Sequence, residues 1–133
     1  MALFADAPPQ VRLQALLDYS RRLPPLPARF ADDPELMERV QECQTPFFLA
    51  VEVDPDRTVS LFFDVPAESP TVRGYAGILY EGLHGAHVEE ILGVPADFYL
   101  RMGLQEAVSP LRLRGMSAIV ARLKRRLKDL QPS

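Results

Sequence analysis

The sequence predicts an α+β fold in which a small antiparallel β-sheet of two to three strands packs against several helices. Two aromatic and β-branched runs, residues 47–53 and 58–65, are typical of paired strands. A helical pattern precedes them near the N-terminus, and further helical patterns occupy most of the chain after residue 69. Helices on either side of one short hairpin in the sequence indicate an α+β layout.

The first element is a helix that begins after Pro8 and Pro9. It is expected to end before the proline-rich segment 24–27, because proline lacks an N–H donor and constrains the residue before it. A loop is expected to follow through Pro34, and residues 35–40 are too short and ambiguous to assign. The positions at helical spacing along this first helix are Leu13, Leu16, Leu17 and Ser20.

A β-hairpin is expected next. Residues 47–53 form its first strand and residues 58–65 its return strand. Between them, residues 54–57 read Asp-Pro-Asp-Arg, which is turn chemistry. An isolated hairpin is only marginally stable in water, so these strands need helices on one face or a third strand beside them.

Helices are expected over most of the remaining chain. Ser69 and Pro70 start one that runs to about Gly82, since serine is a common N-cap and proline suits the first helical turn. Two shorter helices are expected over residues 86–92 and 97–102, each followed by a glycine.

The last helix is expected to begin at Ser109 and Pro110, which repeat the Ser-Pro start. Its apolar stripe comprises Met116, Ile119, Val120, Leu123, Leu127 and Leu130. Five basic residues lie mostly off that stripe: Arg122, Lys124, Arg125, Arg126 and Lys128. A basic helix can bind RNA or anionic lipid, but a solvated face opposite the core is the interpretation we prefer.

Length and composition predict one globular domain over residues 1–133. Residues 1–9 and 131–133 are expected to be flexible ends. The chain is 47% hydrophobic and 25% charged, and its net charge of -3 argues against a general nucleic-acid binder. No run approaches the ~18 apolar residues of a membrane span, and the N-terminus lacks the pattern of a signal peptide. A single cysteine cannot form an internal disulfide, so we expect a cytoplasmic protein.

Charge is distributed unevenly along the chain. Residues 31–70 contain ten acidic residues and only Arg39 and Arg57 as bases, whereas residues 109–133 contain seven bases and only Asp129 as an acid. An acidic face and a basic face would suit oriented docking on a partner, and two solvated surfaces are the alternative interpretation.

Cys43 is the first candidate for chemistry, because a thiol can act as a nucleophile. It lies in a polar segment, residues 40–46, between an unassigned stretch and the first clear strand. Loop positions can present a side chain to a partner, and polar neighbours such as Gln44 and Thr45 are unusual around a core position. A lone cysteine is most often a small buried apolar residue, so both interpretations stay open at this point.

Two histidines, His84 and His87, are the other candidates, and two glutamates follow them. Zinc uses such ligands, but a structural site needs four with fixed geometry, and the glycines near these histidines indicate a loop. We therefore expect no metal site. Either histidine could instead serve as a base to Cys43, as in cysteine hydrolases, although nothing in the sequence places them together.

Gly74 and Gly77 lie within the helix expected after Ser69. They could be mistaken for a phosphate-binding loop, but the Walker lysine and the strand–turn–helix context are absent. Close packing of this helix against another helix is the interpretation we prefer for both glycines.

An ordered set of short motifs covers most of the chain. Residues 40–45, Val-Gln-Glu-Cys-Gln-Thr, precede a hydrophobic strand, and this segment resembles the Val-x-Gly-Cys-x-Ser segment of the family of SufE-type sulfur acceptors. Residues 71–74, Thr-Val-Arg-Gly, fall where the family has Ile-Val-Lys-Gly, and residues 102–104, Met-Gly-Leu, resemble Leu-Gly-Leu. Residues 109–116, Ser-Pro-Leu-Arg-Leu-Arg-Gly-Met, resemble Ser-Pro-x-Arg-x-Asn-Gly-Leu, and residues 23–27 resemble a Leu-Pro-x-Leu-Pro segment.

The resemblance implies a SufE/IscU-like fold and a defined activity. Members of that family dock on a pyridoxal-phosphate cysteine desulfurase, and their cysteine takes the terminal sulfur of the desulfurase persulfide. The sulfur then passes to an iron–sulfur scaffold complex for cluster assembly. On this chain the resemblance implies Cys43 as the acceptor, with no cofactor and no metal of its own. The supporting or partner-binding residues would be Gln44, Thr45 and Arg112, with Arg112 as the counter-charge near the thiol.

Such a chain would be a sulfur-transfer protein that stimulates a desulfurase rather than a stand-alone enzyme. The main alternative is a non-catalytic activator or adaptor of a desulfurase, which would use its charged faces but not its thiol. Glu42 departs from the family, which has glycine before the cysteine, and it would raise the pKa of Cys43 if the two side chains lie close. The family also implies a cysteine that is partly sheltered at rest, so docking must open the loop.

Overall fold

The computed structural model describes residues 9–102, 104 and 108–130. Within them, no helix combines the length and the apolar character needed to cross a membrane. Of the ends expected to be flexible, only Pro9 falls in this range, and it begins the first helix. The elements are α2 (Pro9–Arg22), α3 (Ala28–Ala31), the 3-10 helix η1 (Pro34–Leu36), β1 (Glu38–Arg39), β2 (Phe48–Val53), β3 (Val59–Asp64), α4 (Pro70–Leu83), α5 (Val88–Leu92), the 3-10 helix η2 (Phe98–Met102) and α6 (Pro110–Leu130).

The three strands form one antiparallel sheet in the order β1–β2–β3, which confirms the predicted α+β fold. β2 and β3 pair along their whole length around the expected turn, so the predicted hairpin is confirmed. β1, which the sequence left unassigned, pairs with the start of β2. The ladder extends one step further, because the N–H of Val40 donates to the carbonyl of Phe47 at 2.8 Å. Residues 41–46, including Cys43, therefore connect two paired strands.

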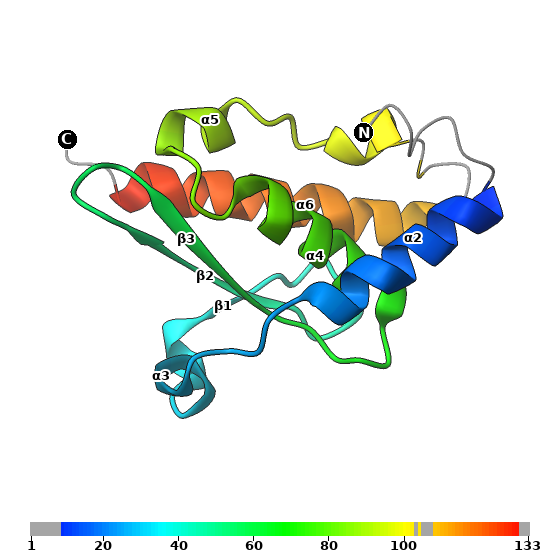
Figure 1. Cartoon of the computed structure of the whole chain (residues 1–133), viewed down its shortest axis with the longest axis horizontal. Helices are drawn as coiled ribbons and strands as arrows, with labels where there is room; N and C mark the ends of the chain where they lie inside the picture. The colour runs from blue at the N-terminus through cyan, green and yellow to red at the C-terminus, as the bar shows by residue number, and fades with distance from the viewer. Residues whose placement is uncertain (1–8, 103, 105–107, 131–133) are drawn as a thin grey trace.

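The sheet separates two clusters of buried side chains. Leu49 and Leu61 face the main core, which they share with residues of α2, α4, α5 and α6. Phe30, Met37 and Ala50 form a smaller cluster on the other face. Figure 1 shows α6 passing along the sheet with α2, α4 and α5 on the same side, whereas α3 lies on the opposite side. The hairpin thus obtains the cover that its marginal stability requires.

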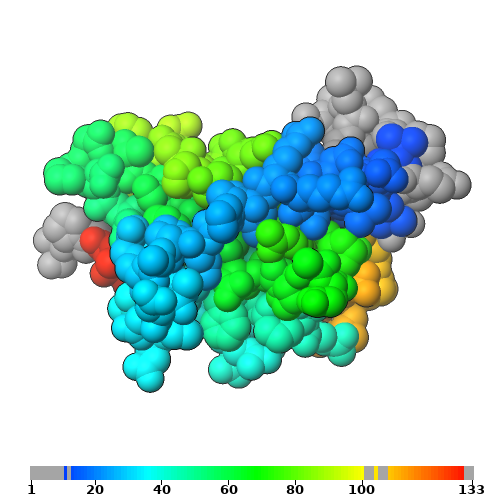
Figure 2. Space-filling view, turned by 60° about the horizontal axis from the view of Figure 1, so that its bottom comes forward, coloured from blue at the N-terminus to red at the C-terminus, as the bar shows by residue number. Residues whose placement is uncertain are grey.

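α2 and α4 pack against each other at very short range. A Cβ at Gly74 would lie 2.1 Å from the carbonyl oxygen of Leu16, and one at Gly77 would lie 2.3 Å from that of Tyr19. No side chain larger than hydrogen fits at either position, which confirms close helix packing as the reason for both glycines. Figure 2 shows α2 (blue) lying directly along α4 (green) on the face turned to the viewer.

Several sequence expectations about individual elements were wrong in detail. The loop expected through Pro34 contains α3 and η1, because this segment buries Phe30 against the outer face of the sheet. The helix expected over residues 97–102 is a 3-10 helix, and the glycine after it lies outside the described residues. Of the predicted stripe on α6, all members are buried except Leu130, which is 49% exposed at the last residue of the helix.

Candidate functional site

Both interpretations that the sequence left open hold for Cys43, because it lies in a loop and its side chain is buried. Its backbone belongs to the β1–β2 connection, where its N–H donates to the carbonyl of Val40 at 3.2 Å. Its side chain is only 6% exposed and joins the main core. The thiol points at α6, because a Cβ placed on Gly115 would lie 2.9 Å from Sγ. Cys43 is thus a loop residue with a sheltered thiol.

A cavity of about 80 Å³ adjoins the thiol. A second cavity of about 140 Å³ shares Thr45, Val72 and Arg112 with it and continues along the start of α4. In Figure 2 the loop after β1 lies beside the start of α4 and the start of α6. The structure therefore brings the sequence-predicted residues together around one opening. The smaller cavity is lined by Cys43, Gln44, Thr45, Val72, Leu111, Arg112 and Gly115.

Thr45 fastens the loop to the start of α4. Its Oγ1 lies 2.9 Å from Oγ of Ser69, within hydrogen-bond distance. Ser69 does precede α4, as the sequence predicted, but its side chain makes no capping hydrogen bond to the helix. The hydroxyl is used for the contact between the loop and the helix instead.

Arg112, the predicted counter-charge, is exposed at the rim of the same cavity. Its guanidinium donates to Oγ1 of Thr71 at 3.3 Å, and its backbone N–H donates to Oγ of Ser109 at 3.4 Å. The arginine whose charge acts on the resting thiol is a different residue of α6, Arg122. Sequence reasoning missed Arg122, which it placed on a solvated face of the helix.

The environment of Cys43 favours the protonated thiol. Burial, and to a lesser extent the charge of Glu42, raise the pKa of Cys43 from 9.0 to about 11, and Arg122 opposes them. The predicted effect of Glu42 is confirmed in direction, with burial as the larger cause. At pH 7 only about one thiol in ten thousand would be ionised at such a pKa. The resting thiol is therefore nearly inert as a nucleophile.

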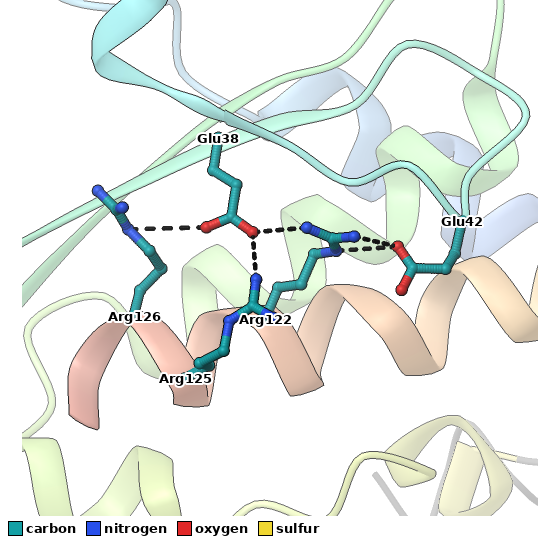
Figure 3. A network of polar contacts seen from close by, with 5 residues as sticks. All are labelled: Glu38, Glu42, Arg122, Arg125 and Arg126. Atoms are coloured by element: carbon teal, nitrogen blue, oxygen red, sulfur yellow. Dashed lines mark hydrogen bonds and ion pairs between the residues drawn. The ribbon is translucent and has the colours of Figure 1, made fainter. Parts of the chain in front are cut away.

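A network of charged side chains joins the loop and β1 to α6, as Figure 3 shows. Arg122 contacts Oε1 of Glu42 at 2.7 Å and Oε2 of Glu38 at 2.7 Å. Arg125 contacts the same oxygen of Glu38 at 2.9 Å, and Arg126 lies 3.8 Å from its other oxygen. These members of the acidic segment and of the basic helix pair with each other, so they do not form two separate solvated surfaces.

The two histidines have other roles. Nδ1 of His84 accepts the N–H of Leu61 at 3.0 Å, and its ring stacks on Tyr80 with 4.4 Å between centroids. The backbone N–H of His87 donates to the carboxylate of Glu90 at 3.2 Å at the start of α5. Neither histidine lines the cavities beside the thiol, so the geometry gives no support to a hydrolase dyad. Across the described residues no group of histidine, cysteine and acidic side chains is arranged to hold a metal ion.

A larger cavity of about 390 Å³ lies at the far end of the hairpin. Its lining comes from the hairpin turn, the start of α5 and the end of α6, and it includes neither cysteine nor histidine. The strongest candidate for chemistry is therefore the smaller opening at Cys43, despite its size.

Comparison with known proteins identifies the family of this chain. The family model described as "SufE: Fe-S metabolism associated domain" matches residues 2–127. The chain belongs to the SufE family. This confirms the resemblance carried by the Cys43 segment and the motifs around it, and it associates the chain with iron–sulfur metabolism.

Relatives of this SufE-family chain span bacteria and plants. A SufE-like protein of Mycobacterium tuberculosis is 48% identical over 126 residues, which cover 95% of this chain and 87% of the relative. SufE-like protein 1 of Arabidopsis thaliana, chloroplastic/mitochondrial, is 27% identical over 92% of this chain and 32% of its own length. The solution structure of a hypothetical protein from Thermus thermophilus matches with a TM-score of 0.81 and 44% identity, covering 96% of this chain and 89% of that one.

Proposed function

We propose that this SufE-family chain is a sulfur acceptor and carrier. In this proposal Cys43 takes persulfide sulfur from a pyridoxal-phosphate cysteine desulfurase and passes it to an iron–sulfur scaffold complex. The observation that carries the proposal is the placement of the chain's single thiol in a short loop beside a surface cavity. A loop held between two paired strands can present its side chain to a docked partner without unfolding the sheet.

The transfer step is an exchange between sulfur atoms. The thiolate of Cys43 attacks the outer sulfur of the donor persulfide, and a new S–S bond forms at Cys43. The S–S bond of the donor breaks, and its electron pair leaves on the donor cysteine as a thiolate. The thiol proton of Cys43 is lost before the attack, so the step needs no external oxidant or reductant. Passing the sulfur onward repeats the exchange with Cys43 as the leaving group.

In the resting structure the thiol is buried, so it must be exposed before it can react as a thiolate. Burial is the main cause of the raised pKa of Cys43, so moving the thiol toward water would bring the pKa back toward 9.0 and raise the thiolate fraction. Shelter at rest also limits oxidation of the thiol between transfers. Docking of the donor would therefore both expose and activate Cys43.

The other predicted residues fit supporting roles around the opening. Gln44 is exposed beside the thiol, and Thr45 holds the loop against Ser69. Arg112 carries a positive charge at the rim of the cavity, where it would stabilise an incoming anionic persulfide. The charge that lowers the pKa of the resting thiol is that of Arg122. We therefore propose that Arg112 acts on the incoming persulfide rather than on the resting thiol.

The test compares the wild-type chain with Cys43→Ser as a stimulant of a cysteine desulfurase. An acceptor removes the persulfide from the desulfurase, so the wild type should raise turnover of L-cysteine and Cys43→Ser should not. An adaptor would act through its surface alone. Equal stimulation by both proteins would therefore overturn the proposal in favour of the adaptor.

A further inference from the structure

Arg122 lies between two carboxylates that differ in burial and in the number of their ion pairs. Glu38, on β1, has a side chain that is 17% exposed and also contacts Arg125 and Arg126. Glu42, on the loop, is 43% exposed, and within the described structure its only ion pair is with Arg122. Glu38 thus fixes the direction of the guanidinium, which reduces the conformational freedom lost when Glu42 pairs with it.

The loop around Cys43 is tied down on both sides of the thiol. On one side Glu42 accepts two hydrogen-bonding contacts from Arg122, at 2.9 Å from Nε and 2.7 Å from the terminal nitrogen (Figure 3). On the other side Thr45 meets Ser69 at 2.9 Å. The second tie is a neutral contact, whereas the first depends on charge. The charged tie is therefore the one that an approaching partner or salt can weaken.

We propose that the Glu42–Arg122 ion pair is an electrostatic latch that keeps the loop of residues 41–46 closed against α6, with the thiol of Cys43 buried between them. A partner reaches Glu42 more readily than Arg122, whose side chain is only 19% exposed. The group that releases the latch is thus a cation on the partner that competes for the Glu42 carboxylate. Release would free the loop to swing out with Cys43. The link to sulfur uptake rests on the proposed function, but the latch itself is a property of the free chain.

The test uses amide hydrogen exchange, which reports loop opening without depending on the ionisation of the thiol. Glu42→Gln keeps the size of the side chain and removes its charge. The matched control is Arg125→Gln, which removes a cation from the same network without touching Glu42. After correction for intrinsic rates, the amide of Cys43, which donates to the carbonyl of Val40 in the closed loop, should exchange up to about fivefold faster in Glu42→Gln, the upper end of the range for losing a partly exposed ion pair. Arg125→Gln should leave that exchange near the wild-type rate.

Salt provides the second arm of the experiment. Raising the ionic strength should accelerate exchange of the loop in the wild type and should not accelerate it in Glu42→Gln. Unchanged exchange in Glu42→Gln, or equal salt dependence in both proteins, would overturn the latch. These measurements need no desulfurase. If the loop opens as expected while Cys43→Ser still stimulates the desulfurase fully, the latch stands and the sulfur-acceptor proposal fails.

Discussion

Gly115 of α6 and Cys43 of the β1–β2 loop are in direct contact, with room for no side chain between them. A Cβ on Gly115 would lie 2.9 Å from Sγ and 3.4 Å from Cα of the cysteine. Glycine at this position leaves room for the thiol against the helix, since a Cβ there would crowd Sγ. Closure of the site therefore depends on the shape of the helix as well as on the charges around it.

Gly115→Ala should force the thiol away from α6. We expect Cys43 to react several-fold faster with iodoacetamide. We also expect overpacking to lower the free energy of unfolding by about 1 kcal/mol. The control is the same change in a Cys43→Ala background, where Sγ is absent. There the substitution should stabilise the chain by up to about 1 kcal/mol, because alanine favours helix more than glycine does. If Gly115→Ala changed the free energy of unfolding equally in both backgrounds, the contact with Sγ would not be the cause of the destabilisation.

Gly74, one of the two glycines at the α2–α4 contact, allows a test of how closely these helices pack. Gly74→Ala should lower the free energy of unfolding by about 3 kcal/mol, because its Cβ would overlap a backbone carbonyl that cannot move aside. Gly82→Ala is the control in the same helix, since its Cβ would meet nothing within 4 Å, and it should gain about 0.5 kcal/mol. Urea unfolding measures both, and equal stability of the two variants would contradict the packing.

The raised pKa of Cys43 predicts how the thiol responds to pH. The folded chain holds the thiol proton more tightly than the unfolded chain does, so the resulting stabilisation is complete below pH 9.0 and is lost as pH rises through about 11. Alkylation by iodoacetamide should accordingly keep rising about tenfold per pH unit beyond pH 9. A rate that levels off near pH 9.0 would mean that the thiol ionises as freely as an exposed cysteine.

Arg112→Ala should slow sulfur uptake more than it lowers stability. Loss of one charged hydrogen-bond donor predicts about tenfold slower uptake, while a change at an exposed position should alter stability by less than about 0.5 kcal/mol. Arg114→Ala is the matched control, since Arg114 is an exposed arginine of the same helix that lines neither cavity at the thiol. Single-turnover sulfur transfer and thermal unfolding provide the two readouts. If Arg112→Ala lowered the rate of sulfur transfer and the thermal stability to the same extent, Arg112 would be a structural residue.

Local patterns in the sequence were enough for much of the fold. The hairpin followed from two β-branched runs around a Pro-Asp turn, and the long C-terminal helix from its apolar stripe. The close packing of α2 and α4 was predictable from Gly74 and Gly77, although the partner helix was not. β1 was beyond such reasoning, because two residues such as Glu38 and Arg39 form a strand only through pairing with β2.

The candidate site was predictable only in part. Cys43 stood out as the single thiol in a polar segment, and the family resemblance added its neighbours. The pairing of Arg122 with Glu38 and Glu42 joins residues 84 and 80 positions apart, so no local spacing could reveal it. The only signal was an excess of acids early and of bases late in the chain. That pattern is equally consistent with pairing inside the chain and with two separate surfaces, and only the fold distinguishes them.

The most direct test of Cys43 as the sulfur acceptor is the mass of the chain after sulfur transfer. The wild type is incubated with a cysteine desulfurase and L-cysteine, and its intact mass and the peptide that contains Cys43 are then measured. We expect a gain of one sulfur atom on Cys43, which a thiol reductant removes and which is absent in Cys43→Ser. An unchanged mass while desulfurase turnover rises, or the same gain in Cys43→Ser, would contradict this role of Cys43.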